Sequence, residues 1–327
     1  MKTYEYYLKE TGNVHSAYYV EAADALGVKY RVLKKHFMVE LSFGDKSCYI
    51  INAATPLSTA TGTTICKRKQ LTNQILKAHN IPVPEQKILG SIRDAIEFYK
   101  ERKDIVIKPI QQIGGKGVSI LPRTSKEVQE DYKIAFAVSK GKSSKKVIGE
   151  EFCQGDNYRF LVLKDKVLAV ARRMPAKVTG DGVHTIQKLI KLENKERKTK
   201  LLKPIIIDRE VIQKLQKDNR TLQDIPVKNE TVLLRYNCNL TTGGTTEECT
   251  KEVNDYYKQY AIKAAKCVDC ELAGIDIIAK DITKKGSFAI NEINYNPGLR
   301  LHYKVDKGEV IKVAYPIIKY IKDKYLK

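Results

Sequence analysis

Hydrophobic and polar residues alternate along the chain with two different periods. Apolar residues three and four apart, the period of an amphipathic helix, occur at 14–27, 66–79, 91–102, 126–141 and 253–268. Short apolar runs typical of strands lie at 30–33, 36–43, 47–54, 105–107 and 272–278, and Gly44 with Asp45 predicts a hairpin turn. Residues 309–326 predict a closing amphipathic helix despite Pro316. Helices mixed with antiparallel strands predict an α+β protein.

The strand at 105–107 leads into a glycine-rich segment. Lys108 follows it directly, Pro109 ends the strand, and Val118 begins a second apolar strand. Glycines between the two strands would let backbone amides approach phosphate oxygens. The candidate phosphate contacts of this turn are Gly114, Gly115, Lys116 and Gly117. A P-loop would continue from Gly-Lys-Ser/Thr into a helix, so the pattern predicts instead a hairpin that folds over a triphosphate.

Three oxygen-bearing side chains near the C-terminus form a candidate metal site. Glu292 and Asn294 are two residues apart in a predicted strand, so their side chains share a face. Asp276 is the single acid in the apolar strand 272–278, where an acid is costly unless it is ligated or paired. Pairing of both acids with surface lysines is the alternative. Oxygen ligands suit Mg²⁺, which substrate phosphates usually complete, so the metal implies a nucleotide.

With these residues in this order, the chain resembles the ATP-grasp ligases. Further segments are similar to the ATP-grasp part of cyanophycin synthetase and, about equally, to the glutathione-synthetase half of the bifunctional bacterial glutathione enzyme. These segments are 147–163, 171–186, 235–250 and 296–303, and the similarity runs from roughly residue 14 to the end. The resemblance implies an ATP-grasp fold, in which two α+β lobes grip ATP, preceded by a short pre-ATP-grasp lobe.

The resemblance also implies a division into lobes. We expect a short pre-ATP-grasp lobe at 1–65, a lid lobe at 66–152 and a C-terminal metal and substrate lobe at 153–327. The sequence holds no counterpart of the second, Mur-ligase-like domain of cyanophycin synthetase or of the γ-glutamylcysteine ligase half of the glutathione enzyme. We therefore expect that it cannot by itself alternate two amino acids by the route of cyanophycin synthetase.

Nucleotide contacts follow from the same resemblance. Lys69 and Lys108 would hold the α- and β-phosphates, and the 114–117 loop would close on the β- and γ-phosphates. The hinge that presents backbone groups to adenine would consist of Glu150, Glu151, Phe152 and Cys153. Asn157 stands where the family usually has an acid that binds the ribose hydroxyls. An asparagine can accept one hydrogen bond there but carries no charge, so the sequence does not predict tight selectivity among nucleotides. Either lysine could instead be a solvated surface charge.

Arginines dominate the substrate side that the resemblance implies, because guanidinium forks suit carboxylates. The residues expected at the substrate are Arg172, Arg173, Lys177, Gly243 and Gly244. Those expected to act near the acyl phosphate are Arg173, Arg235 and Arg300. Each arginine could instead form a surface ion pair. His184 and His302 are expected to pack or hydrogen-bond, because aminolysis of an acyl phosphate needs little base catalysis once the amine is neutral.

The composition has one outlier, a formal charge of +21 from 59 Lys and Arg against 38 Asp and Glu. Lysines are spread along the chain, with clusters at 140–146 and 188–203, and the second cluster predicts an exposed loop or helix. Solvated lysine-rich faces are one explanation of the excess. The alternative is an anionic partner such as a nucleotide, an acidic amino acid or an acidic polymer. We expect no nucleic-acid partner, because no zinc finger, RNA-binding signature or recognition helix accompanies the charge.

Cysteine usage and the N-terminus bear on location. Seven scattered cysteines, an odd number, argue against a disulfide framework. Cys267 and Cys270 form a lone C-x-x-C that small packing residues explain, with a zinc or redox role as the alternative. No apolar run approaches the roughly 20 residues of a membrane span, and the N-terminus has no apolar signal core. We expect a cytoplasmic protein without membrane association; its oligomeric state stays open, and a homo-oligomer is allowed.

These observations together predict an ATP-dependent carboxylate-amine ligase that forms an amide or peptide bond through an acyl phosphate. The expected substrate is an amino acid or short peptide bearing a free carboxylate. The expected cofactors are ATP and two Mg²⁺ ions, with Mn²⁺ as a substitute. The alternative is a non-catalytic ATP-binding or basic interaction module that retains the fold. Phosphate release from ATP in the presence of pooled amino acids or dipeptides would distinguish the two.

Overall fold

The computed structural model describes residues 2–110, 117–139, 146–200 and 202–326. The chain divides into two compact units. The first contains Met1–Ile88, Ile148–Arg172 and Glu248–Lys327, and the second contains Leu89–Val147 and Arg173–Glu247. Both consist of helices and strands with antiparallel pairing, which confirms the α+β class. The three predicted lobes are a different division of the chain and remain a prediction.

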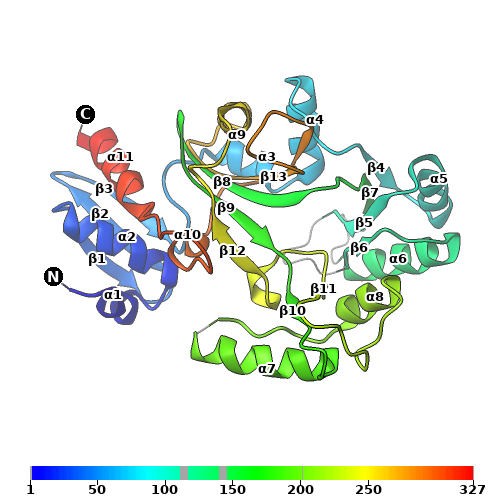
Figure 1. Cartoon of the computed structure of the whole chain (residues 1–327). Helices are drawn as coiled ribbons and strands as arrows, with labels where there is room; N and C mark the ends of the chain where they lie inside the picture. The colour runs from blue at the N-terminus through cyan, green and yellow to red at the C-terminus, as the bar shows by residue number, and fades with distance from the viewer. Residues whose placement is uncertain (1, 111–116, 140–145, 201, 327) are drawn as a thin grey trace. The chain divides into compact units, whose positions relative to one another are not determined.

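The N-terminal part of the first unit packs two helices and a small sheet against the last helix of the chain (Figure 1). Its elements are α1 (Tyr4–Thr11), α2 (Val14–Ala25), β1 (Lys29–Lys34), β2 (Met38–Phe43), β3 (Lys46–Ile51) and α11 (Ala314–Leu326). Phe43 pairs with Lys46, which confirms the predicted hairpin turn. Pro316 lies in the first turn of α11, where its missing N–H would have no helical partner, so the closing helix begins at Ala314.

A five-stranded sheet has the order β12-β9-β8-β13-β14. Its strands are β8 (Asp156–Leu163), β9 (Lys166–Met174), β12 (Thr245–Glu248), β13 (Leu272–Ala279) and β14 (Phe288–Asn294). β8 and β13 pair without a break, with Phe160 and Ile275 in one apolar core and Leu161 and Leu272 in another. Because both faces of these two strands are covered, apolar residues run without a break through 160–163 of β8, and Asp276 is the single charged residue of β13.

Four further helices belong to the first unit. They are α3 (Ala60–Cys66), α4 (Lys69–Ala78), α9 (Asp255–Cys267) and α10 (Arg300–Tyr303). The helix predicted at 66–79 therefore begins at Lys69, and Leu76 anchors it in the core shared with α9. The helix predicted at 253–268 is confirmed as α9.

The second unit contains the glycine-rich segment. β5 (Ile105–Pro109) and β6 (Ser119–Ile120) pair antiparallel, so the predicted hairpin is confirmed. In the strand order β4-β7-β5-β6, the strands β4 (Gln86–Leu89) and β7 (Val147–Glu151) each cross the boundary between the two units. Helices α5 (Ile92–Arg102) and α6 (Ser125–Val138) pack on each other, and α6 packs on β5, around a core that includes Phe98 and Ile107 (Figure 1).

A separate small core supports the rest of the second unit. Its elements are β10 (Lys177–Thr179), α7 (Ile186–Thr199), α8 (Arg209–Lys217), β11 (Thr231–Leu233) and the 3₁₀ turn η1 (Leu240–Thr242). The lysine-rich stretch 188–203 is mostly helix α7, which Thr185 caps and which buries Leu189 and Ile190. Within the described ranges, no helix is both long enough and apolar enough to cross a bilayer.

Candidate active site

Asp276, Glu292 and Asn294 lie on one face of the β13–β14 pair. Asp276 stands opposite Glu292, and Gly274 stands opposite Asn294, and directly opposed residues point to the same side. A register shift after Asp276 leaves Asn291 as an extra residue in β14. The shift changes the alternation of the strand, so Glu292 faces away from the apolar core. The shared face expected for Glu292 and Asn294 is present; their role as metal ligands stays a prediction.

Arg159 on β8 holds the carboxylate of Asp276. Its Nε donates to Oδ1, and its Nη2 donates to Oδ2 at 2.9 Å, deep in the sheet where Asp276 is 2% exposed. Gly274 makes room for this contact, because a Cβ there would lie 3.0 Å from Arg159 Cδ. Burial disfavours the charge on Arg159, but the Asp276 and Glu292 carboxylates outweigh it, so the pKa of Arg159 lies above its ordinary value. The guanidinium therefore stays charged.

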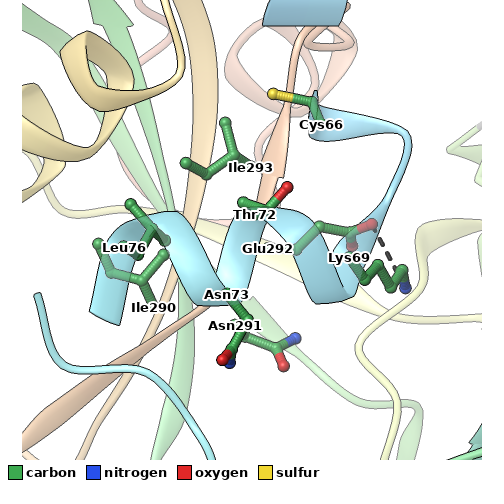
Figure 2. Close-up of a pocket in the computed structure, with 9 residues that line it drawn as sticks. All are labelled: Cys66, Lys69, Thr72, Asn73, Leu76, Ile290, Asn291, Glu292 and Ile293. Atoms are coloured by element: carbon green, nitrogen blue, oxygen red, sulfur yellow. Dashed lines mark ion pairs between the residues drawn. The ribbon is translucent and has the colours of Figure 1, made fainter. Parts of the chain in front are cut away.

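Lys69 brings a second cation to this row of residues. It begins α4, and its Nζ lies 3.4 Å from Glu292 Oε1 (Figure 2). The ion pair lies at a small pocket of the first unit lined by Cys66, Lys69, Thr72, Asn73, Leu76, Ile290, Asn291, Glu292 and Ile293. Both side chains are partly exposed, at 26% for Lys69 and 32% for Glu292, so a ligand can reach Glu292 from solvent.

The two acids predicted to bind magnesium lie beside two cations. Asp276 and Glu292 are balanced by Arg159 and Lys69, so the formal charges of the four side chains sum to zero. The Asn294 amide nitrogen donates to the Gly274 carbonyl at 3.4 Å, so the Asn294 side-chain oxygen points away from that carbonyl. In the part of the chain that the structure describes, no three His, Cys, Asp or Glu side chains are grouped to hold a metal. If the two acids and the amide bind Mg²⁺ as predicted, phosphate or water oxygens would have to complete its octahedral shell.

The predicted adenine hinge continues from the end of β7. Glu150 is buried and accepts a 2.5 Å hydrogen bond from Gln86 Nε2, and the Glu151 amide donates to the Glu85 carbonyl at 2.9 Å. Phe152 and Cys153 are half-buried. The Glu150 side chain is thus engaged inside the protein, and the contact of this segment with adenine stays a prediction. Further along the chain, Asn157 lies at the start of β8, opposite Ile278.

Lys108 is 7% exposed in β5 of the second unit. Of the glycine turn, Gly114, Gly115 and Lys116 fall outside the described residues. Gly117 has φ +71°, a conformation that favours glycine, and a Cβ there would lie 3.1 Å from Val138 Cβ. The structure thus brings Lys69 together with the predicted metal ligands in one unit, and the contribution of Lys108 to that site stays a prediction.

The predicted substrate residues are distributed over both units. In the first, Arg172 Nη2 lies 2.6 Å from Asp156 Oδ2, and Arg300 begins α10. In the second, Arg173 lies near the end of β9, and Lys177 is exposed in β10, opposite Leu233. Their assignment to a substrate stays a prediction.

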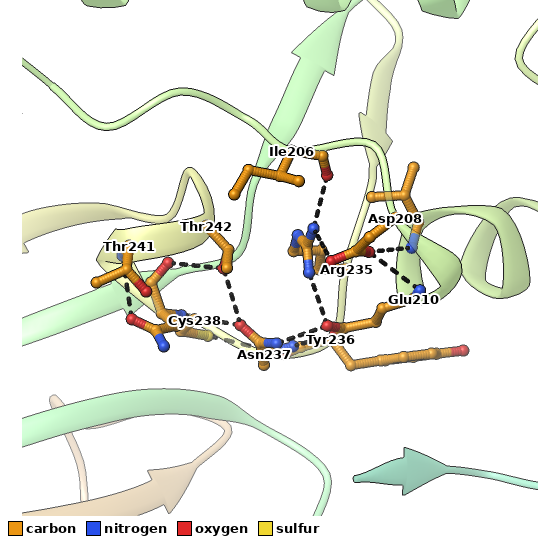
Figure 3. Close-up of polar contacts among 11 residues, drawn as sticks. Ile206, Asp208, Glu210, Arg235, Tyr236, Asn237, Cys238, Thr241 and Thr242 are labelled. Carbon is orange, nitrogen blue, oxygen red and sulfur yellow. Dashed lines mark hydrogen bonds and ion pairs between the residues drawn. The ribbon is translucent and has the colours of Figure 1, made fainter. Parts of the chain in front are cut away.

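Arg235 is enclosed by carboxylates of its own unit. Only 1% exposed, its guanidinium donates to Glu210 Oε2 at 2.8 Å and to the Ile206 carbonyl at 2.6 Å, and it pairs with Asp208 Oδ2 at 2.9 Å (Figure 3). Two acids therefore already neutralise this charge. The role near an acyl phosphate expected for Arg235 stays a prediction.

Gly243 and Gly244 form a tightly packed turn after η1. Gly243 has φ +102°, and a Cβ there would lie 2.7 Å from Ile205 Cγ1. The Gly244 amide donates to the Asn239 carbonyl at 3.1 Å, and its own carbonyl accepts from buried Arg197 at 3.4 Å. Close packing requires glycine at Gly243, whether or not a substrate binds here.

The two histidines of the resembling segments differ in their surroundings. His302 is 2% exposed, and burial together with the charge of Arg159 lowers its pKa to about 3, so the ring is neutral. His184 lies in an exposed turn with Nδ1 2.6 Å from Asp181 Oδ2. The burial of His302 agrees with the packing role expected from the sequence.

Comparison with known families defines the class. Residues 67–179 match the phosphoribosylglycinamide synthetase ATP-grasp (A) domain, and residues 185–321 match the RimK-like ATP-grasp domain. Together these two matches cover Lys69, Arg159, Asp276 and Glu292, the segment 150–153, the β5–β6 hairpin and the turn after Arg235. The chain belongs to the ATP-grasp ligases, a family that uses ATP and divalent metal ions.

The chain is similar along most of its length to particular members of this family. The chain is 34% identical over 313 residues to the glutathione biosynthesis bifunctional protein of Listeria monocytogenes, a match that covers 92% of this chain and 40% of the relative. It is 32% identical over 316 residues to the cyanophycin synthetase of Crocosphaera subtropica, covering 91% of this chain and 35% of the relative. A crystal structure of a bifunctional glutathione synthetase from Pasteurella multocida superposes with a TM-score of 0.66 at 26% identity, covering 94% of this chain and 44% of that one. The chain thus spans 35 to 44% of the length of these three proteins.

Sequence reasoning missed Arg159, Asp208 and Glu210. Arg159 carries a signal, because it is a cation inside the apolar run 158–163 just as Asp276 is an acid inside 272–278. Asp208 with Glu210 two residues later is typical of a helix N-terminus. The spacing gives no sign that both acids meet Arg235, which follows Glu210 by 25 residues.

Proposed function

We propose that the chain joins a carboxylate to an amine at the expense of ATP, through an acyl phosphate. The observation that carries this proposal is the row of Arg159, Asp276, Glu292 and Lys69 in an ATP-grasp chain. Two acids with matched cations form a neutral and partly open site, which suits a metal bound to a polyphosphate better than a free metal ion.

The chemistry requires charge neutralisation more than covalent help from the protein. A carboxylate oxygen of the first substrate attacks the γ-phosphorus, and the bond to ADP breaks. The amine nitrogen of the second substrate then attacks the acyl carbon, inorganic phosphate leaves, and the amine loses a proton to solvent. Both partners of the first step are anionic, so positive charge and orientation lower the barrier. Lys69 and Lys108 would supply that charge on the nucleotide side.

Asp276, Glu292 and Asn294 would hold the divalent ion. A bound Mg²⁺ supplies Lewis-acid stabilisation of the phosphoryl oxygens. We propose two Mg²⁺ ions, with Mn²⁺ able to replace them, since three protein oxygens leave several coordination positions for phosphate and water. Arg159 would keep Asp276 ionised and fixed in orientation.

The substrate that we propose is an amino acid or short peptide bearing a free carboxylate. Relatives named for glutathione biosynthesis and cyanophycin synthesis support this class. Arg172, Arg173, Lys177 and Arg300 would contact its carboxylates. The seven free thiols suit a reducing cytoplasm, which also supplies ATP. Assembly into a homo-oligomer is compatible with this function and is tested by its mass in solution.

A substrate-pool assay tests the proposal. The protein is incubated with ATP, MgCl₂ and pools of amino acids and dipeptides; phosphate release is followed, and products are identified by mass spectrometry. We expect phosphate release that depends on both partners and a product with the mass of the two substrates less one water. Glu292→Gln, which removes a proposed ligand, serves as the inactive control. Nucleotide binding without substrate-dependent phosphate release from any pool would favour a non-catalytic module.

A further inference from the structure

A chain of polar contacts begins at the first turn of α8 and reaches the Gly243-Gly244 turn. Asp208 caps the helix, and its side chain accepts hydrogen bonds from the amides of Glu210 and Val211 at 3.1 and 3.3 Å. The other oxygen of the same carboxylate pairs with Arg235 at 2.9 Å. Asp208 therefore fixes both the start of the helix and one side of the guanidinium.

Glu210 is the branch point of these contacts. Its Oε2 accepts from Arg235 Nη1 at 2.8 Å and from Asn237 Nδ2 at 2.6 Å, and its Oε1 accepts from the Asn237 amide at 3.3 Å (Figure 3). Hydrogen bonds to an ionised acceptor are roughly twice as strong as neutral ones. An acid in the first helical turn is further stabilised by the helix dipole. One carboxylate thus orients Arg235 and both donors of Asn237.

Asn237 links Glu210 to the turn through its side-chain oxygen. Its Oδ1 accepts from the Asn239 amide at 3.1 Å and from Thr242 Oγ1 at 3.4 Å (Figure 3). Asn239 then accepts from the Thr241 amide at 3.0 Å through its side chain and from the Gly244 amide at 3.1 Å through its carbonyl. Every step from Glu210 to Gly244 is a hydrogen bond.

The far end of α8 is also anchored. Lys217 Nζ donates to the carbonyls of Ile120 and Leu121, the latter at 2.7 Å, directly after β6. Arg123 donates to the Lys217 carbonyl. A helix fixed at both ends is a rigid support, and a site is held most accurately by groups on such supports.

We propose that Glu210 is a positioning residue of the ligase reaction. It holds the turn 237–244 in the geometry that meets the carboxylate-bearing substrate, and Arg235 acts through this network rather than by touching the acyl phosphate. Arg235 with Asp208 and Glu210 carries a net charge of −1 (one positive and two negative groups), which would repel an anion. The turn instead offers hydroxyls and backbone groups. This inference rests on the proposed function.

Kinetics of Glu210 variants test the inference. Glu210→Ala removes both acceptors, and Glu210→Gln keeps one. We expect Glu210→Ala to raise the KM of the carboxylate substrate by about tenfold or more, the effect of roughly 1.4 kcal/mol, with the KM for ATP within about twofold. Glu210→Gln should fall between this variant and the wild type. A purely structural role would lower the melting temperature and the active fraction without separating the two KM values.

Glu230→Ala is the matched control. Glu230 belongs to the same unit, forms an ion pair with Arg220, and has a side chain 27% exposed against 28% for Glu210. It takes no part in the contacts that lead to Gly244. We therefore expect both KM values of Glu230→Ala to equal those of the wild type.

Amide hydrogen exchange supplies a readout independent of turnover. Glu210→Ala should speed exchange at the amides of Asn237, Asn239 and Thr241, and Glu230→Ala should not. The inference is overturned, and the proposed function is not, if the wild type is active and Glu210→Ala changes neither the KM of the carboxylate substrate nor the amide exchange. A wild type that ligates nothing in the substrate pools overturns the proposed function and, with it, this inference.

Discussion

Arg159 and Asp276 face each other across β8 and β13 and are joined by two hydrogen bonds inside the sheet. The pair is almost fully buried, and only one end of the row, at Glu292 and Lys69, is open to solvent. A buried pair contributes little net stability, because desolvation of two charges offsets their attraction. Its effect is to fix the position and charge of Asp276 beside Glu292.

Removing one partner of this pair should therefore lower the free energy of unfolding more than replacing both partners by apolar residues. We expect Arg159→Met to lower the free energy of unfolding by about 3 to 5 kcal/mol, because it leaves Asp276 buried and unpaired. The double variant Arg159→Met with Asp276→Leu should recover most of that loss. Urea unfolding of the two single variants and the double variant measures the coupling. Additive losses would show that the two residues do not stabilise each other.

Glu292 should be essential for turnover but not for nucleotide binding. We expect Glu292→Gln to lower Mg²⁺-dependent turnover by about 10²-fold or more, because a neutral amide binds the ion more weakly, while ATP still binds. Steady-state kinetics over a range of Mg²⁺ concentrations provide the measurement. Glu40→Gln, in a strand of the same unit and paired with Arg31, is the control. Turnover like the wild type in Glu292→Gln would remove this residue from the metal site.

Local sequence patterns predicted the helices, strands and turns better than the contacts between distant segments. The turn at Gly44-Asp45, the helix α5 and the β5–β6 hairpin follow from short-range periodicity and turn chemistry, and all are present. The shared face of Glu292 and Asn294 also followed from the two-residue period of a strand. These features depend on residues that are close together in the sequence, so a single sequence is enough to predict them.

Contacts between distant segments could not be predicted in this way. The ion pairs of Arg235 with Asp208, the N-cap of α8, and with Glu210 in its first turn have no signal in the sequence. The bulge at Asn291 depends on how β14 pairs with β13 and has no signal of its own. The pairing of charges inside a fold is decided by tertiary structure, so only the cost of burying them, seen at Arg159 and Asp276, appears in the sequence.

Lys108 should contribute to ATP affinity. It is nearly buried at the end of β5, where a charge-assisted contact to phosphate would be strong. We expect Lys108→Ala to weaken ATP binding by roughly 1.5 to 3 kcal/mol, measured by calorimetry. Lys87→Ala, which removes an exposed lysine from β4, is the control. Unchanged ATP affinity in Lys108→Ala would place this lysine outside the nucleotide site.

His302 should make stability depend on pH in the acidic range. Its native pKa of about 3 lies below the ordinary value of 6.5, so between these limits only the unfolded chain binds the proton. Stability is therefore fully present above pH 6.5 and falls as pH falls toward 3, by up to about 1.4 kcal/mol per pH unit from this group. Urea unfolding at pH 7 and pH 5 should show a smaller pH dependence in His302→Phe than in the wild type. An equal pH dependence would contradict the buried neutral state.

Arg172 and Arg173 should act on the carboxylate substrate and not on ATP. We expect Arg172→Ala and Arg173→Ala each to raise the KM of that substrate while leaving the KM for ATP nearly unchanged, since a guanidinium fork suits a carboxylate. Arg93→Ala, which removes an exposed arginine paired with Glu97 on α5, is the control. A fall in ATP affinity with unchanged substrate KM would assign the two arginines to the nucleotide instead.

The salt dependence of the same reaction tests whether the charge of +21 serves the substrate. Attraction between exposed charges is screened over about 8 Å at 0.15 M ionic strength, so kcat/KM for an anionic substrate should fall as salt rises. The fall should be smaller in Arg172→Ala, because one of the attracting charges is already gone. A neutral substrate analogue, if the enzyme accepts one, should show little dependence. A kcat/KM for the anionic substrate that does not change with salt would leave the lysine excess as a property of the solvated surface alone.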